Sequence, residues 1–175
     1  SDQVLAQGGV IYGAGMDKNF NVVHKRAVNA KERDELRGSK YVQSDMNNAY
    51  RLACEDLKAG RLVLFTGTPC QVDGIKALCP KGCEEHLICM DIVCHGVPSP
   101  RVWNDYKAYV ERKYHGKIEK IDFRNKERFG WSDHWETVTI NGKEHDSQVY
   151  MKMFYEHTFL REACYICPYK NLQRI

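Results

Sequence analysis

The sequence predicts an α/β fold in which a mixed sheet is flanked by helices. Two apolar runs, residues 62–65 and 86–93, have the length of buried strands, and each leads through a loop into a helical pattern. This alternation is typical of parallel strands joined by crossover helices. The 175 residues are 43% hydrophobic and 28% charged, which suits one domain with a sizeable core. We expect residues 1–175 to form a single catalytic-core domain with a small β-hairpin and a C-terminal cysteine extension.

The composition excludes several classes of protein. The net charge is +3, from 26 basic and 23 acidic side chains, and this excess is too small to indicate a nucleic-acid partner. No apolar run approaches the roughly 20 residues of a membrane span, and no signal peptide is visible. Because the chain starts at Ser1 without a Met, we expect a fragment of a longer protein. Eight cysteines without a secretion signal favour metal binding or catalysis in the cytoplasm over a disulfide framework.

The first half of the chain predicts a hairpin followed by two helix–strand units. A turn-forming segment, 17–21, separates two strand patterns. Asp45 is placed to cap a helix, and Pro69 suits the first turn of another because its missing N–H costs nothing there. The expected elements are strands 9–16 and 21–27, a helical turn at 31–37, helix 46–58, the central strand 61–66, and a helix from 69 to 78.

The second half predicts another helix, a strand, a hairpin and a last helix. Ser99 and Pro100 form an N-terminal capping signal, and Asn141-Gly142 is the strongest two-residue hairpin signal. The expected elements are strand 86–93, helix 101–114 with an aromatic core face, strand 117–123, strand 135–140 paired with the segment from Lys143, and amphipathic helix 149–160.

Four cysteines stand where a shared site is expected. Cys70 and Cys94 follow the two buried strands, and ligands of open α/β sheets bind outside the carboxyl ends of the strands. Cys70 also lies near a helix N-terminus, whose positive end favours the thiolate that binds metal. Cys164 and Cys167 form a C-x-x-C chelating pair. We therefore predict one metallocluster site; Cys54 and Cys89 are interpreted as core residues, and Cys79 and Cys83 as bystanders or alternative ligands.

Thiolates alone do not decide between zinc and iron–sulfur. Two remote single cysteines plus one close pair differ both from a compact zinc ribbon and from the compact ferredoxin run. Two other classes of function stay open. One is a zinc-stabilised, non-catalytic interaction domain, and the other is a metal-free thiol oxidoreductase that uses Cys164 and Cys167 as its dithiol.

Two further features carry functional interpretations beside structural ones. The loop Arg37-Gly38-Ser39-Lys40 combines two cations with a hydroxyl, which suits an anionic cofactor, although a solvated loop has the same composition. His95 adjoins Cys94 and is our candidate catalytic residue, as a proton relay or a group that tunes the cluster. A structural capping role for His95 is the alternative.

The motifs together resemble the beta-subunit family of coenzyme F420 (deazaflavin) hydrogenases and dehydrogenases. Their order and spacing cover nearly all of the chain. The motifs that carry the resemblance are Gly67-Thr68-Pro69-Cys70-Gln71, the run from Cys94 to Pro100, Phe123-Arg124, Gly130-Trp131, and Cys164-x-x-Cys167 with Tyr169-Lys170.

The resemblance implies a flavo-iron–sulfur oxidoreductase. It implies a 4Fe-4S cluster held by Cys70, Cys94, Cys164 and Cys167, and an FAD near the loop 37–40. Thr68 and Gln71 become candidate cofactor-binding residues. The implied partners are a redox protein or ferredoxin-like domain and a small-molecule acceptor, either coenzyme F420 or another deazaflavin or flavin.

The chain departs from the family pattern at both ends. It lacks the Ser/Gly-rich stretch that usually precedes the first strand, and the Gly-Asp-Phe-Trp-Gly-like run that usually follows the C-x-x-C pair. We therefore expect a trimmed core that binds flavin poorly.

Overall fold

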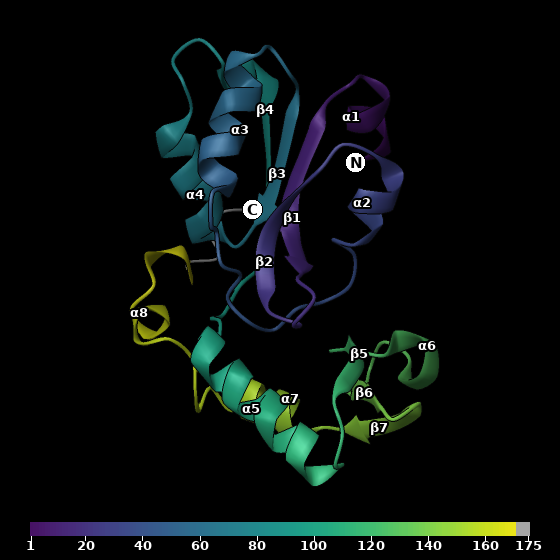
Figure 1. Cartoon of the computed structure of the whole chain (residues 1–175). Helices are drawn as coiled ribbons and strands as arrows, with labels where there is room; N and C mark the ends of the chain where they lie inside the picture. Colours follow the sequence, from purple (N-terminus) through teal and green to yellow (C-terminus); the bar gives the residue numbers. More distant parts are fainter. Residues whose placement is uncertain (171–175) are drawn as a thin grey trace. The chain divides into compact units, whose positions relative to one another are not determined.

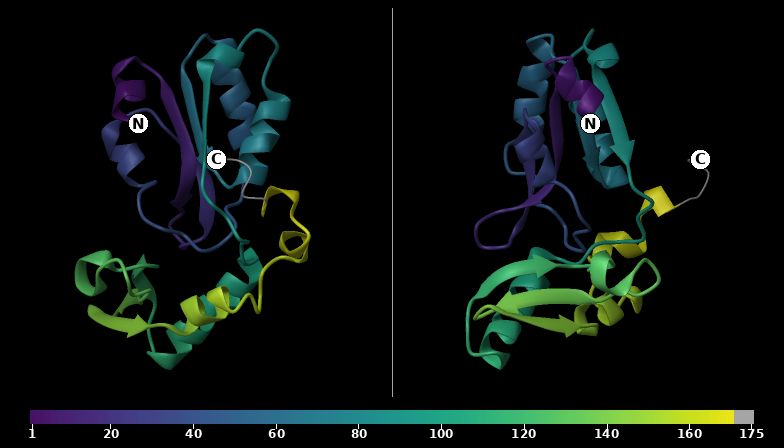
Figure 2. Two further views of the ribbon diagram at one scale, coloured as in Figure 1. Left: turned by 180° about the vertical axis from the view of Figure 1, so that it is seen from behind. Right: turned by 90° about the vertical axis from the view of Figure 1, so that its right-hand side faces the viewer.

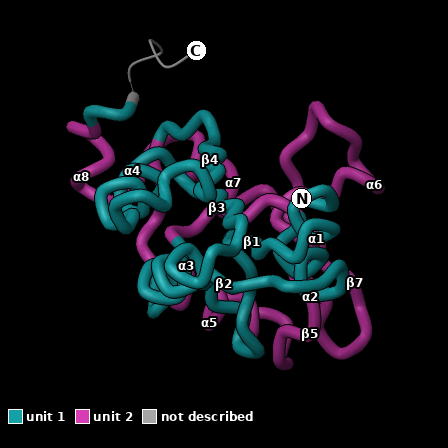
Figure 3. Tube along the Cα trace, turned by 90° about the horizontal axis from the view of Figure 1, so that it is seen from above, with its two compact units in different colours: residues 1–37, 44–95, 168–175 teal, residues 38–43, 96–167 magenta. Residues whose placement is uncertain are grey.

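The computed structural model describes residues 1–170, which fall into two compact units (Figures 1 and 3). Unit 1 takes in residues 1–37, 44–95 and the segment from Pro168, and unit 2 takes in residues 38–43 and 96–167. The chain thus enters each unit more than once. The expectation of a single folding domain stays a prediction, because compactness does not test whether the units fold independently.

Unit 1 is built on a four-stranded sheet of order β2-β1-β3-β4. Strand β1 (Val10–Met16) pairs antiparallel with β2 (Val22–Ala27) and parallel with β3 (Val63–Gly67), and β3 pairs parallel with β4 (Leu87–Asp91). This confirms the predicted α/β fold with a mixed sheet. The helices are α1 (Asp2–Ala6), α2 (Ala30–Asp34), α3 (Ala49–Lys58), α4 (Pro69–Leu78), and the 3-10 turns η1 (Glu84–His86) and η2 (Pro168–Lys170).

Helices cover both faces of this sheet, and the alternation of side chains explains why (Figure 2). Neighbouring residues of a strand point to opposite faces. Tyr12 and Phe65 therefore pack with α3 and α4, while Ile11 and Leu64 pack with α1 on the other face. Burial of apolar side chains on both faces is what holds a parallel sheet between helices.

One polar network lies within this core. The hydroxyl of Tyr12 donates to Asp56 at 2.6 Å, and the Arg26 guanidinium donates two hydrogen bonds of 2.8 Å to the same carboxylate. Burial alone would raise the pKa of Asp56, but the hydrogen bonds from Arg26 and Tyr12 lower it below its ordinary value. The network ties α3 to β1 and β2 through a charge that is only 8% exposed.

Two expectations for this unit are wrong in detail. Strand β4 is not buried, because it is the last strand of the sheet and exposes Ile88 and Met90. Asp45 does not cap α3. Its backbone forms an isolated bridge with Val23 instead, and the helix begins four residues later, at Ala49.

Unit 2 holds a second, antiparallel sheet of order β5-β6-β7, with strands β5 (Ile118–Asp122), β6 (Glu136–Ile140) and β7 (Lys143–Ser147). The predicted hairpin is confirmed: Asn141 and Gly142 connect β6 to β7 with φ of 51° and 69°. Both values fit the type I′ turn that the dipeptide favours. The helices of this unit are α5 (Pro100–Lys113), α6 (Lys126–Phe129), α7 (Val149–Tyr155) and α8 (Glu162–Tyr165).

An aromatic core joins α5, α7 and the sheet of unit 2. Trp103 and Tyr106 of α5 lie with ring centroids 5.2 Å and 5.0 Å from that of Tyr150 on α7, and Phe123 lies 4.6 Å from Trp103. This confirms the aromatic core face predicted for the helix. The last predicted helix, in contrast, ends at Tyr155 rather than at residue 160. Among residues 1–170, no helix is long and apolar enough to cross a membrane.

Candidate functional site

Cys70 is the second residue of α4, and the loop before it is fixed by side-chain hydrogen bonds. The Oε1 atom of Gln71 accepts from the Thr68 backbone N–H at 3.0 Å, and its Nε2 donates to Ser44 Oγ at 2.8 Å. Gln71 is 6% exposed, so its amide has little access to water and depends on these partners. The Cys70 side chain is exposed, and its sulfur lies 3.2 Å from Thr68 Oγ1. A rigid loop therefore presents an accessible thiol at a helix N-terminus.

Cys94 leaves the sheet at the same edge. Gly67 of β3 is paired with Asp91 of β4, and the Ile92 N–H donates to the Gly67 carbonyl at 3.2 Å. Cys70 lies three residues after Gly67, and Cys94 lies three residues after Asp91. The prediction that parallel strands bring both cysteines to one carboxyl edge is confirmed by this register.

In unit 2, the segment 96–98 pairs with the segment that carries the C-x-x-C motif. Pro98 forms an isolated antiparallel bridge with Leu160, and the Arg161 N–H donates to the Val97 carbonyl at 3.0 Å. The Cys164 N–H in turn donates to the Arg161 carbonyl at 2.8 Å. The chain that follows Cys94 thus anchors the turn that holds Cys164.

Gly96 makes the closest approach in this pairing. Its φ is +137°, and a Cβ added to it would lie 2.5 Å from Leu160 Cδ1 and 3.3 Å from Cys164 Cβ. The first of these distances is a clash, and L side chains rarely adopt this φ. This φ favours glycine, and the backbone two residues after Cys94 lies beside the C-x-x-C turn.

The predicted cofactor loop is divided between the two units. Arg37 is the last residue of the first segment of unit 1 and is exposed, with its Nε 3.1 Å from Asp34. Gly38, with φ of +83°, opens the segment that belongs to unit 2, followed by half-buried Ser39 and Lys40.

The end of this segment is anchored within unit 2. The Gln43 N–H donates to the Pro98 carbonyl at 3.0 Å, and the Arg161 guanidinium donates to the Gln43 side chain. The hydroxyl of Tyr150 donates to the Tyr41 carbonyl at 3.0 Å. Segments 41–43, 96–98 and 160–164 therefore meet in one place, which the sequence alone did not indicate.

The roles of the candidate residues stay predictions. The cofactor-binding candidates are Arg37, Gly38, Ser39, Lys40, Thr68 and Gln71, and the candidate catalytic residue His95 is half-buried beside Cys94. Within residues 1–170, no three or more His, Cys, Asp or Glu side chains are arranged to hold a metal ion. All eight cysteines lie within these residues, and each is present as a thiol.

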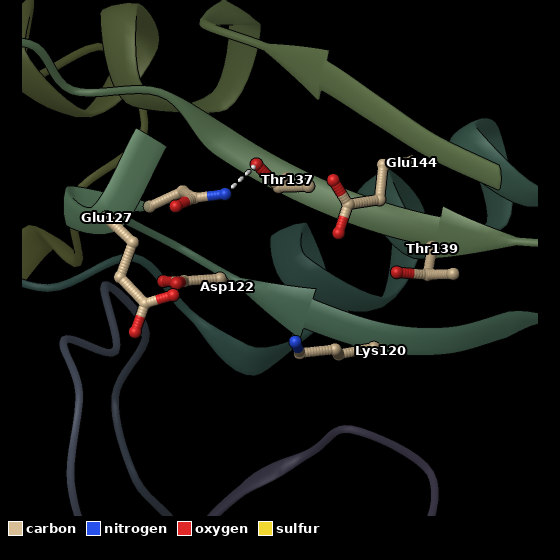
Figure 4. Close-up of a pocket in the computed structure, with 7 residues that line it drawn as sticks. Lys120, Asp122, Glu127, Thr137, Thr139 and Glu144 are labelled. Carbon is tan, nitrogen blue, oxygen red and sulfur yellow. Dashed lines mark hydrogen bonds between the residues drawn. The ribbon is translucent and has the colours of Figure 1, made fainter. Parts of the chain in front are cut away.

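A polar cavity of about 80 Å³ lies elsewhere in unit 2, on one face of its sheet (Figure 4). A hydrogen bond of 3.0 Å from Asn125 to Thr137 closes one side of it. Charged and hydroxyl side chains of this kind are typical of the solvated face of an antiparallel sheet. Its lining contains no cysteine and none of the predicted site residues: it consists of Lys120, Asp122, Asn125, Glu127, Thr137, Thr139 and Glu144.

A comparison with protein families gives a match over much of the chain. Residues 60–174, more than half of the chain, match the family described as the C terminus of the coenzyme F420 hydrogenase/dehydrogenase beta subunit. The chain belongs to this family. No curated protein matches the sequence.

A solved structure shows the same fold. It is a chain of the F420-reducing [NiFe] hydrogenase complex from Methanosarcina barkeri, with a TM-score of 0.58 and 16% sequence identity. The match covers 95% of the present chain and 58% of the hydrogenase chain, so this member of the F420 hydrogenase beta-subunit family spans little more than half the length of that chain.

Proposed function

We propose that this protein is an oxidoreductase that passes electrons between a 4Fe-4S cluster, FAD and a further acceptor. Cys70, Cys94, Cys164 and Cys167 would be the ligands of the cluster. Membership of the coenzyme F420 hydrogenase/dehydrogenase beta-subunit family supports an electron-transfer role. The donor set of four thiolates is the one that four-iron clusters use.

The observation that carries the proposal is the packing of Gly96. This glycine follows Cys94 by two residues, and a Cβ added to it would lie 3.3 Å from Cys164 Cβ. Three consecutive Cα atoms span at most about 7 Å. The covalent chain therefore limits the distance from Cys94 to Gly96, which a ligand set shared by Cys94 and Cys164 requires. Cys70 and Cys94 share one edge of the parallel sheet for the independent reason of strand register.

FAD would be held by the loop 37–40, and Thr68 and Gln71 are the further candidate cofactor-binding residues. Arg37 and Lys40 supply cations for a diphosphate, and Gly38 lets the backbone turn toward a ligand without a Cβ in the way. When bound, a flavin supplies exchange of electrons in pairs or singly, whereas a cluster supplies single-electron transfer. His95 would hold or move a proton beside Cys94.

The partners follow from the same proposal. The matched hydrogenase chain is part of a complex, so we expect a redox partner protein or a ferredoxin-like domain. The acceptor would be coenzyme F420 or another deazaflavin or flavin. We also propose a cytoplasmic location, because the thiolate ligands of a cluster need a reducing compartment.

Anaerobic reconstitution followed by iron, sulfide and zinc assays tests the cluster. We expect about four iron and four sulfide per chain with broad visible absorption. Cys70→Ser should lose most of the iron, because one of four ligands is missing. Cys54→Ser is the matched control and should keep it, since Cys54 donates its S–H to the Leu78 carbonyl at 3.3 Å within unit 1.

Three results would overturn the assignment. Unchanged iron in Cys70→Ser would remove Cys70 from the ligand set. One zinc in a colourless protein that unfolds on chelation would indicate a structural zinc domain. Disulfide reductase activity in metal-free protein would indicate a thiol oxidoreductase.

A flavin titration tests the loop separately. Replacing Lys40 with Gln removes one charge-assisted hydrogen bond, worth about 1.5–3 kcal/mol, so FAD affinity should fall about ten- to hundredfold. Lys18→Gln, in the turn between β1 and β2, provides the control. Equal affinities of the two variants would exclude the loop 37–40 as the flavin site.

A further inference from the structure

Unit 1 contains a second group of cysteines, distinct from the proposed cluster ligands. Four half-buried thiols from separate segments pack against one apolar cluster, whose members include Leu57, Phe65 and Ile75. They come from α3, from the end of α4, from the turn after it and from β4; they are Cys54, Cys79, Cys83 and Cys89. The spacing of these cysteines does not predict that they lie together, because they are spread over 36 positions of the chain.

Two of these thiols flank a tight turn. Cys79 caps the C-terminus of α4, and the Cys83 N–H donates to the Pro80 carbonyl at 3.0 Å. Gly82 adopts φ of +81°, the value that a type II turn has at its third residue. The chain therefore reverses between Cys79 and Cys83, and both side chains reach the same apolar cluster.

The electrostatics agree with this proximity. Burial raises the pKa of the Cys79 thiol, and Glu84 and then Cys83 raise it further, ahead of Cys54 and Cys89. Cys83 is therefore the thiol that interacts most strongly with Cys79. Cys54 donates its S–H to the Leu78 carbonyl at 3.3 Å, and Cys79 donates its S–H to the Pro80 carbonyl at 3.8 Å, within the turn that leads to Cys83.

We propose that Cys79 and Cys83 form a reversible disulfide, so that the turn after α4 is a redox modification site. The oxidant is a small-molecule disulfide. Cys83 borders the exposed turn residues Lys81 and Gly82, and its thiolate attacks one sulfur of the oxidant, breaking that S–S bond and releasing one small thiol. Cys79 then attacks the mixed disulfide, closes the Cys79–Cys83 bond and releases the second small thiol. The protein loses two electrons and two protons, and the oxidant gains both.

Peptide mapping tests this site in the full chain. The reduced protein is equilibrated anaerobically in buffers of increasing oxidised-to-reduced glutathione ratio, quenched by alkylation and digested with trypsin. Cleavage after Lys81 places the two cysteines in different peptides, 77–81 and 82–101. We expect the linked species to rise about tenfold across the series, with fragment ions that assign the bond to Cys83 rather than to Cys89 or Cys94.

Two variants complete the test. Cys83→Ser should abolish the linked species, and Cys54→Ser should leave it unchanged. Persistence of the link in Cys83→Ser, linkage of peptide 77–81 to another cysteine, or full alkylation of Cys79 at every ratio would each overturn the proposal. The proposal would also be overturned if both thiols resisted alkylation and a chelator restored their reactivity, because that result would indicate a metal site. Cys70→Ser separates the two proposals, since it should lose iron while keeping the linked peptide.

Discussion

Glu136 allows the sharpest prediction from the structure. Its side chain lies on β6 and is 1% exposed, among the aromatic rings of unit 2. The Tyr106 hydroxyl donates to one carboxyl oxygen, while the other, Oε2, has no hydrogen-bond partner within the described residues. Burial raises the pKa of this carboxyl from 4.5 to about 8. Glu136 is therefore a neutral carboxylic acid near pH 7.

The direction of the pH effect follows from that shift. Between pH 4.5 and 8 the folded protein keeps a proton that the unfolded chain releases, so the free energy of unfolding falls as pH rises and levels off above about 8. One pKa unit is worth about 1.36 kcal/mol, so this group lowers the stability by about 3 kcal/mol between pH 5.5 and pH 8.5. For a chain of this size, the loss corresponds to a fall of roughly 6–12 °C in Tm.

Glu136→Gln tests this reasoning. Glutamine cannot ionise and keeps an oxygen that accepts a hydrogen bond from Tyr106. The variant should therefore lose the Glu136 contribution to the pH dependence of the free energy of unfolding, and it should be more stable than the parent at pH 8.5. Denaturant unfolding at pH 5.5 and pH 8.5 measures the difference. Glu127→Gln, an exposed carboxyl of α6, is the control and should follow the parent. If parent and Glu136→Gln lose the same free energy between the two pH values, Glu136 is not a buried acid.

Three other substitutions probe the site and its support. Gly96→Ala should lower the free energy of unfolding by about 2–5 kcal/mol, because it introduces backbone strain and overpacking. Gly130 also has a positive φ but has open space where a Cβ would lie, so Gly130→Ala should cost less. Similar costs for the two variants would show that the close packing of Gly96 is not needed. Gln71→Ala should lower stability by about 1–3 kcal/mol, because it strands buried backbone and hydroxyl partners, and an unchanged denaturation midpoint would contradict the proposed anchoring of the Cys70 loop. Asp56→Ala should cost about 3 kcal/mol by leaving its arginine unpaired. Folding lowers the pKa of Asp56, so the stability that its carboxylate provides is present above about pH 3.8 and is lost as the pH falls through the pKa of the folded state. If Asp56→Ala lowered the free energy of unfolding by the same amount at pH 2 and at pH 7, this reasoning would be refuted.

The sequence predicted local features well because each depends on neighbouring residues. Ser99 and Thr68 cap their helices, Pro69 begins α4, and Asn141-Gly142 forms the hairpin turn. The sequence predicts too early a start for helix α3, because Asp45 is a typical N-cap residue. In the structure the backbone of Asp45 pairs with Val23, more than 20 residues away. Such pairing is decided by the sheet and leaves no local signal.

Strand alternation, helix caps and motif spacing depend on short stretches of chain, so the α/β class, the family and the order of the cysteines could be predicted from the amino-acid sequence. Three other facts could not: β4 is an edge strand, Gly96 packs against the Cys164 turn, and Cys79 and Cys83 pack against one apolar cluster. Each of these facts depends on segments far apart in the chain. Their contacts form when apolar surface is buried cooperatively across the unit, and no short stretch of sequence records that outcome.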